Sequence, residues 1–131
     1  MDYQILIDKA LEARELAYVP YSNFKVGSAV LFESGDIYSG CNIENASFSP
    51  TICAERVAFA KAVSEGEREF KAIAIAAKKK GKLATFTPCG VCRQVMSEFC
   101  DDDFTVLVVT GEGIYEEYVL AELLPASFKL D

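Results

Sequence analysis

Three cysteines and one glutamate stand in a spacing that could hold a metal ion and use it. The sequence contains Cys53-Ala54-Glu55 and, further along, Pro88-Cys89-Gly90-Val91-Cys92. Zinc binds thiolate sulfur readily, and a catalytic zinc has three protein ligands and a fourth position left for water or substrate. Cys53, Cys89 and Cys92 match that count. We therefore predict one Zn²⁺ per chain, with a water molecule activated beside it.

Two helices must bring these residues together. Cys89 and Cys92 are three positions apart, so both sulfurs lie on one side of the first turn if a helix begins near Gly90. Cys53 precedes a run of helix formers that should end at Gly66. We therefore expect two helix N-termini to point their partial positive charge at the thiols, which favours the thiolate form.

The two residues that follow Ala54 have separate expected roles. On a helix, Glu55 points roughly 200° away from Cys53, so we do not expect it to be a fourth ligand. Its carboxylate could instead reach into the pocket beside the metal and carry protons, as in zinc-dependent chemistry on nucleobases. Zinc with three thiolates has a net negative charge, and Arg56 is the residue placed to compensate it.

Other interpretations of the cysteines stay open at this point. A closed structural zinc site needs four ligands, and because the chain contains no histidine, only Cys41 or Cys100 could supply the fourth. The cysteines could also be buried apolar residues without a metal, in which case their spacing would be accidental. The three-cysteine site with Glu55 remains the prediction.

Composition limits the class of protein. The chain has 131 residues, the size of one domain, and we expect a single domain over residues 1–131. No apolar run approaches the roughly 18 residues that span a bilayer, and the N-terminus lacks the layout of a secretory signal, so we expect a cytoplasmic protein without a membrane partner. Five cysteines, an odd number, favour reduced thiols over a disulfide framework.

The charge of the chain disfavours one class of substrate. The net charge is −7, which repels phosphates, so we expect no nucleic-acid polymer as a partner. The basic residues cluster at Lys78-Lys79-Lys80 and Lys82, where we predict a solvated surface loop.

The pattern along the chain predicts alternating helices and strands. A first helix should begin at Asp2 and run to about Ala17, before Pro20. Turn chemistry at Ser34-Gly35-Asp36 predicts an antiparallel hairpin between two strands. Further strands are expected on either side of the helix at Cys89, and a last strand and short helix before Pro125. The predicted strands span residues 25–33, 37–42, 71–77 and 104–110, and one begins near Ile114.

Connection lengths predict how these strands pair. The strand, helix, strand order around Cys89 implies a parallel pair with the helix on one sheet face. Gly111-Glu112-Gly113 is too short for a parallel crossover, so the last strand should be antiparallel to the strand before it. The expected architecture is a layered α/β/α domain with a mixed five-stranded sheet and an antiparallel last strand.

Four blocks in order along the chain resemble the homotetrameric cytidine deaminases. They are Pro20-Tyr21-Ser22-Asn23-Phe24-Lys25-Val26-Gly27, Gly40-Cys41-Asn42-Ile43-Glu44-Asn45, Cys53-Ala54-Glu55-Arg56 and Pro88-Cys89-Gly90-Val91-Cys92-Arg93-Gln94. The resemblance covers nearly the whole chain. It implies a zinc-dependent enzyme of pyrimidine salvage that converts cytidine and deoxycytidine to uridine and deoxyuridine with release of ammonia. The first ligand, Cys53, is a cysteine, and in this respect the chain resembles the relatives that act on free nucleosides.

The resemblance also implies substrate contacts. Asn42 and Glu44 are expected at the ribose hydroxyls, Phe24 beside the pyrimidine, and the Ala54 backbone at the polar edge of the base. Phe128, in a C-terminal block similar to that of the family, is expected to reach the site of a neighbouring subunit in a homotetramer with sites at the subunit interfaces.

Two alternatives and two departures accompany this prediction. A blasticidin-type antibiotic nucleoside deaminase shares the cysteine motifs, but Asn42 and Arg56 speak against it. A non-catalytic zinc protein that binds nucleosides is the second alternative, and Glu55 is the residue such a protein could lose. Phe48 stands where tyrosine is common in the family, and Thr87 replaces a usual serine; we expect both to tune function without abolishing it.

Overall fold

Along the described chain, helices alternate with pairs of consecutive strands. A computed structural model describes residues 3–130. Its elements are α1 (Gln4–Arg14), β1 (Phe24–Phe32), β2 (Ile37–Cys41), α2 (Ala54–Ser64), β3 (Phe70–Lys79), β4 (Lys82–Ala84), α3 (Gly90–Phe99), β5 (Thr105–Gly111), β6 (Ile114–Val119) and α4 (Leu120–Leu123).

One mixed sheet forms the middle layer. The strand order is β2-β1-β3-β5-β6, and β4 pairs with the end of β3. The β3–β5 pair is parallel and every other pair is antiparallel, which confirms the predicted crossover and the antiparallel last strand. The five predicted strands are present, and β4 is a sixth strand that the sequence pattern did not indicate.

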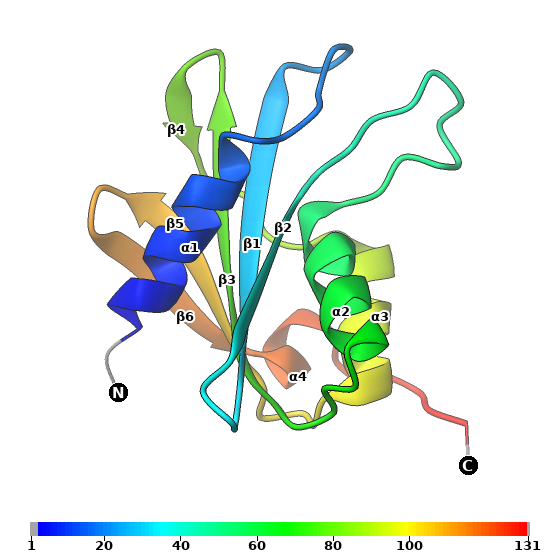
Figure 1. Cartoon of the computed structure of the whole chain (residues 1–131). Coiled ribbons are helices and arrows are strands. Elements are labelled where there is room, and N and C mark those ends of the chain that lie inside the picture. Colours follow the sequence, from blue (N-terminus) through cyan, green and yellow to red (C-terminus); the bar gives the residue numbers. More distant parts are fainter. Residues whose placement is uncertain (1–2, 131) are drawn as a thin grey trace.

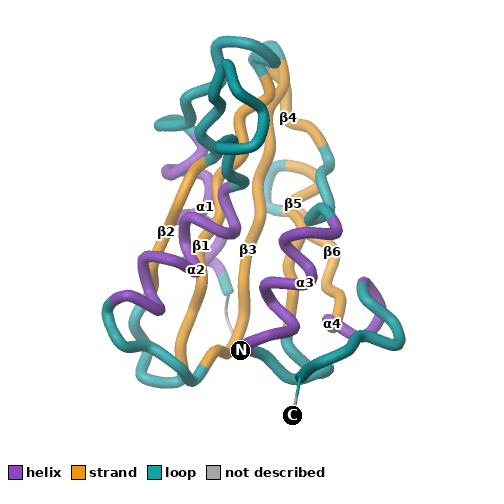
Figure 2. The backbone as a smooth tube through the Cα atoms, turned by 90° about the vertical axis from the view of Figure 1, so that its right-hand side faces the viewer, coloured by secondary structure: helices purple, strands orange, loops and turns teal. Residues whose placement is uncertain are grey.

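Helices cover both faces of the sheet, which confirms the layered α/β/α prediction. Figure 1 shows α1 on one side and α2 and α3 on the other. Alternate residues of β3 serve the two faces: Ala72, Ala74 and Ala76 pack with α1, while Ile73 and Ile75 belong to the larger core beneath α2 and α3. Figure 2 shows α2 and α3 together along this second face.

Two glycines let helices approach the sheet closely. A Cβ atom at Gly40 of β2 would lie 2.7 Å from the backbone nitrogen of Ala58 and 2.9 Å from the backbone oxygen of Ala54, both in α2. A Cβ atom at Gly27 of β1 would lie 2.1 Å from the backbone oxygen of Ala10 in α1. Gly40 therefore sets the depth of the first turn of α2, and Gly27 sets the depth of α1.

One predicted boundary of the first helix was wrong. The first helix ends at Arg14 instead of near Ala17, because Leu16 is 79% exposed and Tyr18 turns away to hydrogen-bond the backbone of residues 42 and 44. The predicted cap at Asp2 lies outside the described residues.

The lysine cluster is not a loop. Lys78 and Lys79 end β3, Lys82 begins β4, and Lys80-Gly81 forms the turn of a β-hairpin. Both turn residues have positive φ, 52° and 79°, which matches a tight hairpin. No described helix is long and apolar enough to cross a membrane.

Candidate active site

The three predicted metal ligands lie together where α2 and α3 begin. Cys53 is the N-cap residue of α2, Cys89 is the N-cap residue of α3, and Cys92 lies in the first turn of α3. Their sulfur atoms all lie within 4.8 Å of one another, and they form the sole such group of potential metal ligands within residues 3–130. The structure thus brings together the three cysteines that the sequence motifs predicted.

The donor set fits zinc. Tetrahedral zinc with Zn–S bonds of ~2.3 Å requires sulfur atoms about 3.8 Å apart. The Sγ atoms of Cys53 and Cys89 lie 3.7 Å apart. Cys41 and Cys100 are free thiols outside this group, so the described chain offers three cysteine ligands and no fourth. This count suits a site with one open coordination position rather than a closed structural site.

Hydrogen bonding among the thiols prepares one of them to bind a metal. The pKa of the Cys53 thiol falls to about 5, first because the Cys92 thiol hydrogen-bonds to its sulfur and further because Arg56 does. The same bond to Cys53, together with burial, raises the pKa of the Cys92 thiol. These hydrogen bonds favour the thiolate form of Cys53, and zinc binding would displace the proton of the Cys92 thiol.

Arg56, in the first turn of α2, contacts the cluster. Its Nη2 atom donates a hydrogen bond to the Sγ atom of Cys53 over 3.5 Å. The Cys53 sulfur in turn raises the pKa of the guanidinium, which stays charged. This contact lies where the sequence placed the compensating charge, since Arg56 is one helical turn after Cys53.

Glu55 is the most unusual polar residue of the site. Its side chain is 1% exposed, and neither carboxylate oxygen has a hydrogen-bond partner among the described residues. Burial raises the pKa of Glu55 to about 7. A buried carboxylate without partners costs free energy, and a pKa near neutrality suits a group that must both accept and donate a proton.

Glu55 faces a cavity of about 230 Å³ next to the cluster. Cys53 and Ala54 also line this cavity, so the buried carboxylate of Glu55 and a metal-binding cysteine lie against the same space. The remaining lining residues come from β1, the loop before it, the segment after β2 and the segment before α3: Ser22, Phe24, Val26, Asn42, Glu44 and Phe86.

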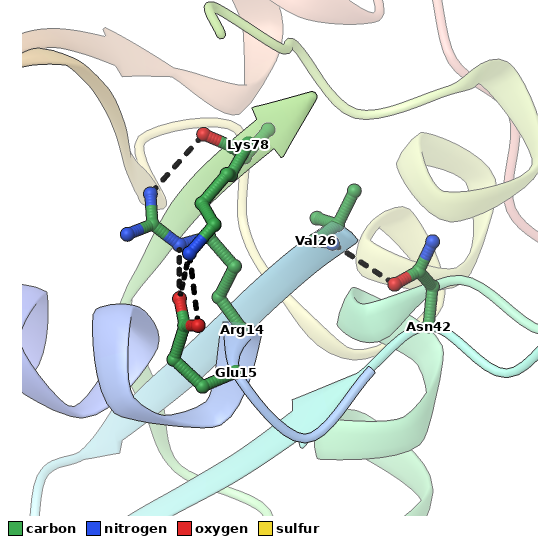
Figure 3. A network of polar contacts seen from close by, with 6 residues as sticks. Arg14, Glu15, Val26, Asn42 and Lys78 are labelled. Carbon is green, nitrogen blue, oxygen red and sulfur yellow. Dashed lines mark hydrogen bonds and ion pairs between the residues drawn. The ribbon is translucent and has the colours of Figure 1, made fainter. Parts of the chain in front are cut away.

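The two predicted ribose contacts line this cavity, and hydrogen bonds to neighbouring segments hold both side chains. The Asn42 Oδ1 atom accepts a hydrogen bond from the Val26 N–H over 2.9 Å (Figure 3), and its Nδ2 atom donates to the Phe24 carbonyl over 2.9 Å. The Glu44 carboxylate accepts hydrogen bonds from the Tyr21 N–H, the Ser22 N–H and the Ser22 hydroxyl. The Ser22 hydroxyl is the main reason that the pKa of Glu44 is lowered.

The other predicted substrate contacts divide into two groups. Phe24 and the fully buried Ala54 line the cavity. Phe128 does not: it is 66% exposed, and the tail that carries it is fixed near the C-terminal end of α3, where Lys129 Nζ donates to the Cys100 carbonyl over 3.0 Å. The cluster lies at the opposite, N-terminal end of α3.

Sequence reasoning missed two residues around the site. Phe86 lines the cavity beside Phe24, although nothing in its spacing marked it. Arg93 supports the ligand loop: its Nε atom donates to the Pro88 carbonyl and its Nη1 atom to the Leu123 carbonyl, each over 2.6 Å. Its position directly after Cys92 was the available signal, since a cation there can reach back to the loop.

Comparison with known proteins agrees with this geometry. Residues 1–108 match the family model for the cytidine and deoxycytidylate deaminase zinc-binding region. A cytidine deaminase from Sporosarcina psychrophila is 52% identical over 128 residues, covering 98% of this chain and 92% of the relative. A cytidine deaminase from Halalkalibacterium halodurans is 50% identical over 128 residues, covering 98% and 95%.

A solved structure shares the whole fold. The crystal structure of cytidine deaminase from Burkholderia pseudomallei superimposes with a TM-score of 0.89 at 42% sequence identity, covering 98% of this chain and 100% of that one. With the three-cysteine cluster, the buried glutamate beside it and these matches, the chain belongs to the zinc-dependent cytidine and deoxycytidylate deaminase family.

Proposed function

We propose that this chain catalyses the hydrolytic deamination of cytidine and deoxycytidine to uridine and deoxyuridine, with release of ammonia. The observation that carries the proposal is Glu55, a buried carboxylate without hydrogen-bond partners that faces a cavity shared with Cys53. Such a group is unfavourable for stability and has its rationale in proton transfer. Neither a blasticidin-type deaminase nor a non-catalytic zinc protein is favoured by the relatives of the chain.

The chain's own residues would divide the chemical work. Zinc held by Cys53, Cys89 and Cys92 would lower the pKa of a water molecule at its open position. Glu55 would accept the proton of that water, deliver it to N3 of the cytosine ring as the hydroxide oxygen attacks C4, and then help transfer a proton to the departing amino group. Arg56 would offset part of the negative charge of the thiolates through its bond to Cys53.

The other residues of the cavity would bind the nucleoside. Glu44 accepts hydrogen bonds well, and Asn42 retains one further amide N–H, so both can contact ribose hydroxyls at the mouth of the cavity. Phe24 would pack beside the base, and the Ala54 backbone would contact its polar edge. No lysine or arginine lines this cavity within residues 3–130, which suits an uncharged nucleoside more than a nucleotide.

We further infer a homotetramer with sites at the subunit interfaces. Phe128 and the cluster lie at opposite ends of α3, so a site completed by Phe128 would belong to another copy of the chain. An apolar groove of about 450 Å³ along α2 and α3, lined in part by Phe59, Val63, Val95 and Phe99, offers a surface for such a copy.

A cytoplasmic role in pyrimidine salvage follows from the same chemistry. All five cysteines are free, and three of them must stay reduced to bind zinc, which is the state of thiols in the cytosol. Free cytidine and deoxycytidine are intermediates that a salvage enzyme would process there.

The deciding experiment follows the loss of cytidine absorbance with purified protein of known zinc content. Cytosine, CMP and blasticidin S serve as comparison substrates. Turnover of cytidine alone supports the proposal. One zinc per chain with no turnover of any of these compounds would overturn it in favour of a non-catalytic protein.

A further inference from the structure

We propose that Phe86 is a substrate-binding residue, and that its ring and the ring of Phe24 together form an aromatic wall against which the pyrimidine of the substrate packs. The inference rests on the proposed function. Both rings line the cavity that contains Glu55. Their centroids are 5.4 Å apart and their planes are inclined by 55°.

The fold holds the two rings on separate supports that meet at one end of the sheet. Phe24 begins β1 and pairs with Lys79 of β3. Phe86 follows β4, which is fastened to the same end of β3 through the pair Ala77 and Ala84. The short β3–β4 hairpin therefore has a role that its lysine-rich sequence does not suggest: it carries the chain to the point where Phe86 faces Phe24.

Packing from behind keeps the Phe86 ring in place. Phe86 is partly buried, and it packs against the core cluster beneath α2 and α3, as Phe24 and Ala84 also do. The next residues, Thr87 and the buried Pro88, lead directly into Cys89. The ring is thus set by the same segment that sets a metal ligand, so base and metal would keep a fixed relative position.

The chemistry of the cavity matches a flat heteroaromatic ring. Its polar groups sit on the sides supplied by Asn42, Glu44 and Glu55, while Phe24, Phe86 and Val26 supply apolar surface. Two tilted rings offer both an edge and a face, and aromatic contacts of this kind contribute affinity beyond simple burial. Because the wall contacts a part of the base that does not react, it should act on binding and leave the chemical step alone.

The test compares Phe86→Leu with Phe70→Leu. Phe70 is a partly buried phenylalanine at the edge of the same core that does not line the cavity, so the same change there matches the loss of packing. Phe86→Leu should raise both the KM for cytidine and the equilibrium dissociation constant for uridine about 10-fold. Its kcat should stay within about twofold of that of the unmodified protein, and its zinc content should not change. Phe86→Tyr, which keeps the ring, should restore KM.

Each result then has one meaning. Phe70→Leu should lower thermal stability with no change in KM. Unchanged KM and uridine affinity in Phe86→Leu, or an equal change in Phe70→Leu, would overturn the role of Phe86. Absence of cytidine turnover in the unmodified protein would instead overturn the proposed function, and uridine affinity would still test the wall. If Phe86→Leu does not fold, Phe86→Met repeats the test, because methionine removes the ring and fills more of its space with a flexible side chain.

Discussion

The guanidinium of Arg56 donates to the sulfur of Cys53 over 3.5 Å, so a cation and a metal ligand of the same helix are in direct contact. Replacing Arg56 with alanine should lower kcat/KM about 10- to 100-fold, because the negative charge of the thiolates is then less compensated and zinc becomes a weaker Lewis acid. Steady-state kinetics and urea unfolding should show a larger loss of activity than of stability. Arg56→Lys keeps the charge and loses the planar guanidinium, so its kcat/KM should lie between those of Arg56→Ala and the unmodified protein. Unchanged kinetics with normal zinc content would remove the charge-compensation argument.

Glu55→Ala should keep zinc and lose turnover. General acid–base catalysis contributes about 10²- to 10⁴-fold, so a loss of at least that size is expected in single-turnover assays. Glu55→Gln is the matched variant, because it keeps the shape of the side chain and cannot carry the proton. Turnover near that of the unmodified protein, in either variant, would show that Glu55 is not the proton shuttle.

Loss of one ligand should release zinc. Cys89→Ser is expected to reduce bound zinc well below one per chain, as measured by atomic absorption after dialysis, because a hydroxyl is a poor ligand for zinc in place of thiolate. Cys41→Ser is the control, since Cys41 lies outside the cluster. Equal zinc content in the two variants would count against the three-cysteine site.

Arg93→Met should weaken zinc retention, because the Pro88 carbonyl loses the charged donor that holds it beside Cys89. Groups that orient metal ligands typically affect metal affinity about 10- to 100-fold, and a chelator chase should show zinc release faster by a similar factor.

Arg68→Met is the control for Arg93. Arg68 also donates to two backbone carbonyls, those of Val63 and Glu67, and it is exposed at the end of α2 away from the ligands. It should release zinc at the unmodified rate. The same acceleration in both variants would mean that general destabilisation is responsible.

The ion pairs of Glu15 should make stability depend on acid pH. Glu15 accepts hydrogen bonds from Lys78 over 2.9 and 3.0 Å and from Arg14 over 3.3 Å (Figure 3). The bond from Lys78 is the main reason that the pKa of Glu15 is lowered from its ordinary value of 4.5. The contribution is therefore present above pH 4.5 and is lost as pH falls through the lowered pKa.

Glu15→Gln tests this dependence. Because the pair is largely exposed, we expect the variant to lose no more than about 1 kcal/mol of unfolding free energy at pH 7. The difference from the unmodified protein should shrink in high salt, and it should shrink as the pH falls below 4.5 and through the lowered pKa of Glu15, as followed by urea unfolding. A difference that is the same at pH 7 and pH 3 would show that the charge of Glu15 is not involved.

The helices and the metal ligands were accessible from sequence because their signals are local. Helix formers after Cys53 and the turn at Gly66 defined α2, and the spacing of Cys89 and Cys92 placed both on one turn of α3. The short connection at Gly111-Glu112-Gly113 likewise predicted the antiparallel pairing of β5 with β6. Each of these inferences depended on residues within a few positions of one another.

The features that sequence did not reveal depend on contacts between distant segments. β4 forms because Lys82–Ala84 pairs with the end of β3, and a strand of three residues is too short to show a periodicity in the sequence. Phe86 enters the cavity because of that pairing. Asn42 was expected at the ribose only, whereas its amide also fastens the segment after β2 to the backbone of β1 at Phe24 and Val26.

The alanines of β3 that face α1 imply unequal mutational tolerance on the two sides of the sheet. Ala72, Ala74 and Ala76 meet a helix that Gly27 already allows to approach as closely as its backbone permits. An added methyl group there would crowd the buried residues of α1 in the same cluster, whereas smaller side chains at Ile73 and Ile75 on the other side would leave neighbouring side chains to adjust. A saturation library of β3 should therefore retain alanine and glycine at positions 72, 74 and 76. It should retain a wider range of aliphatic residues at positions 73 and 75.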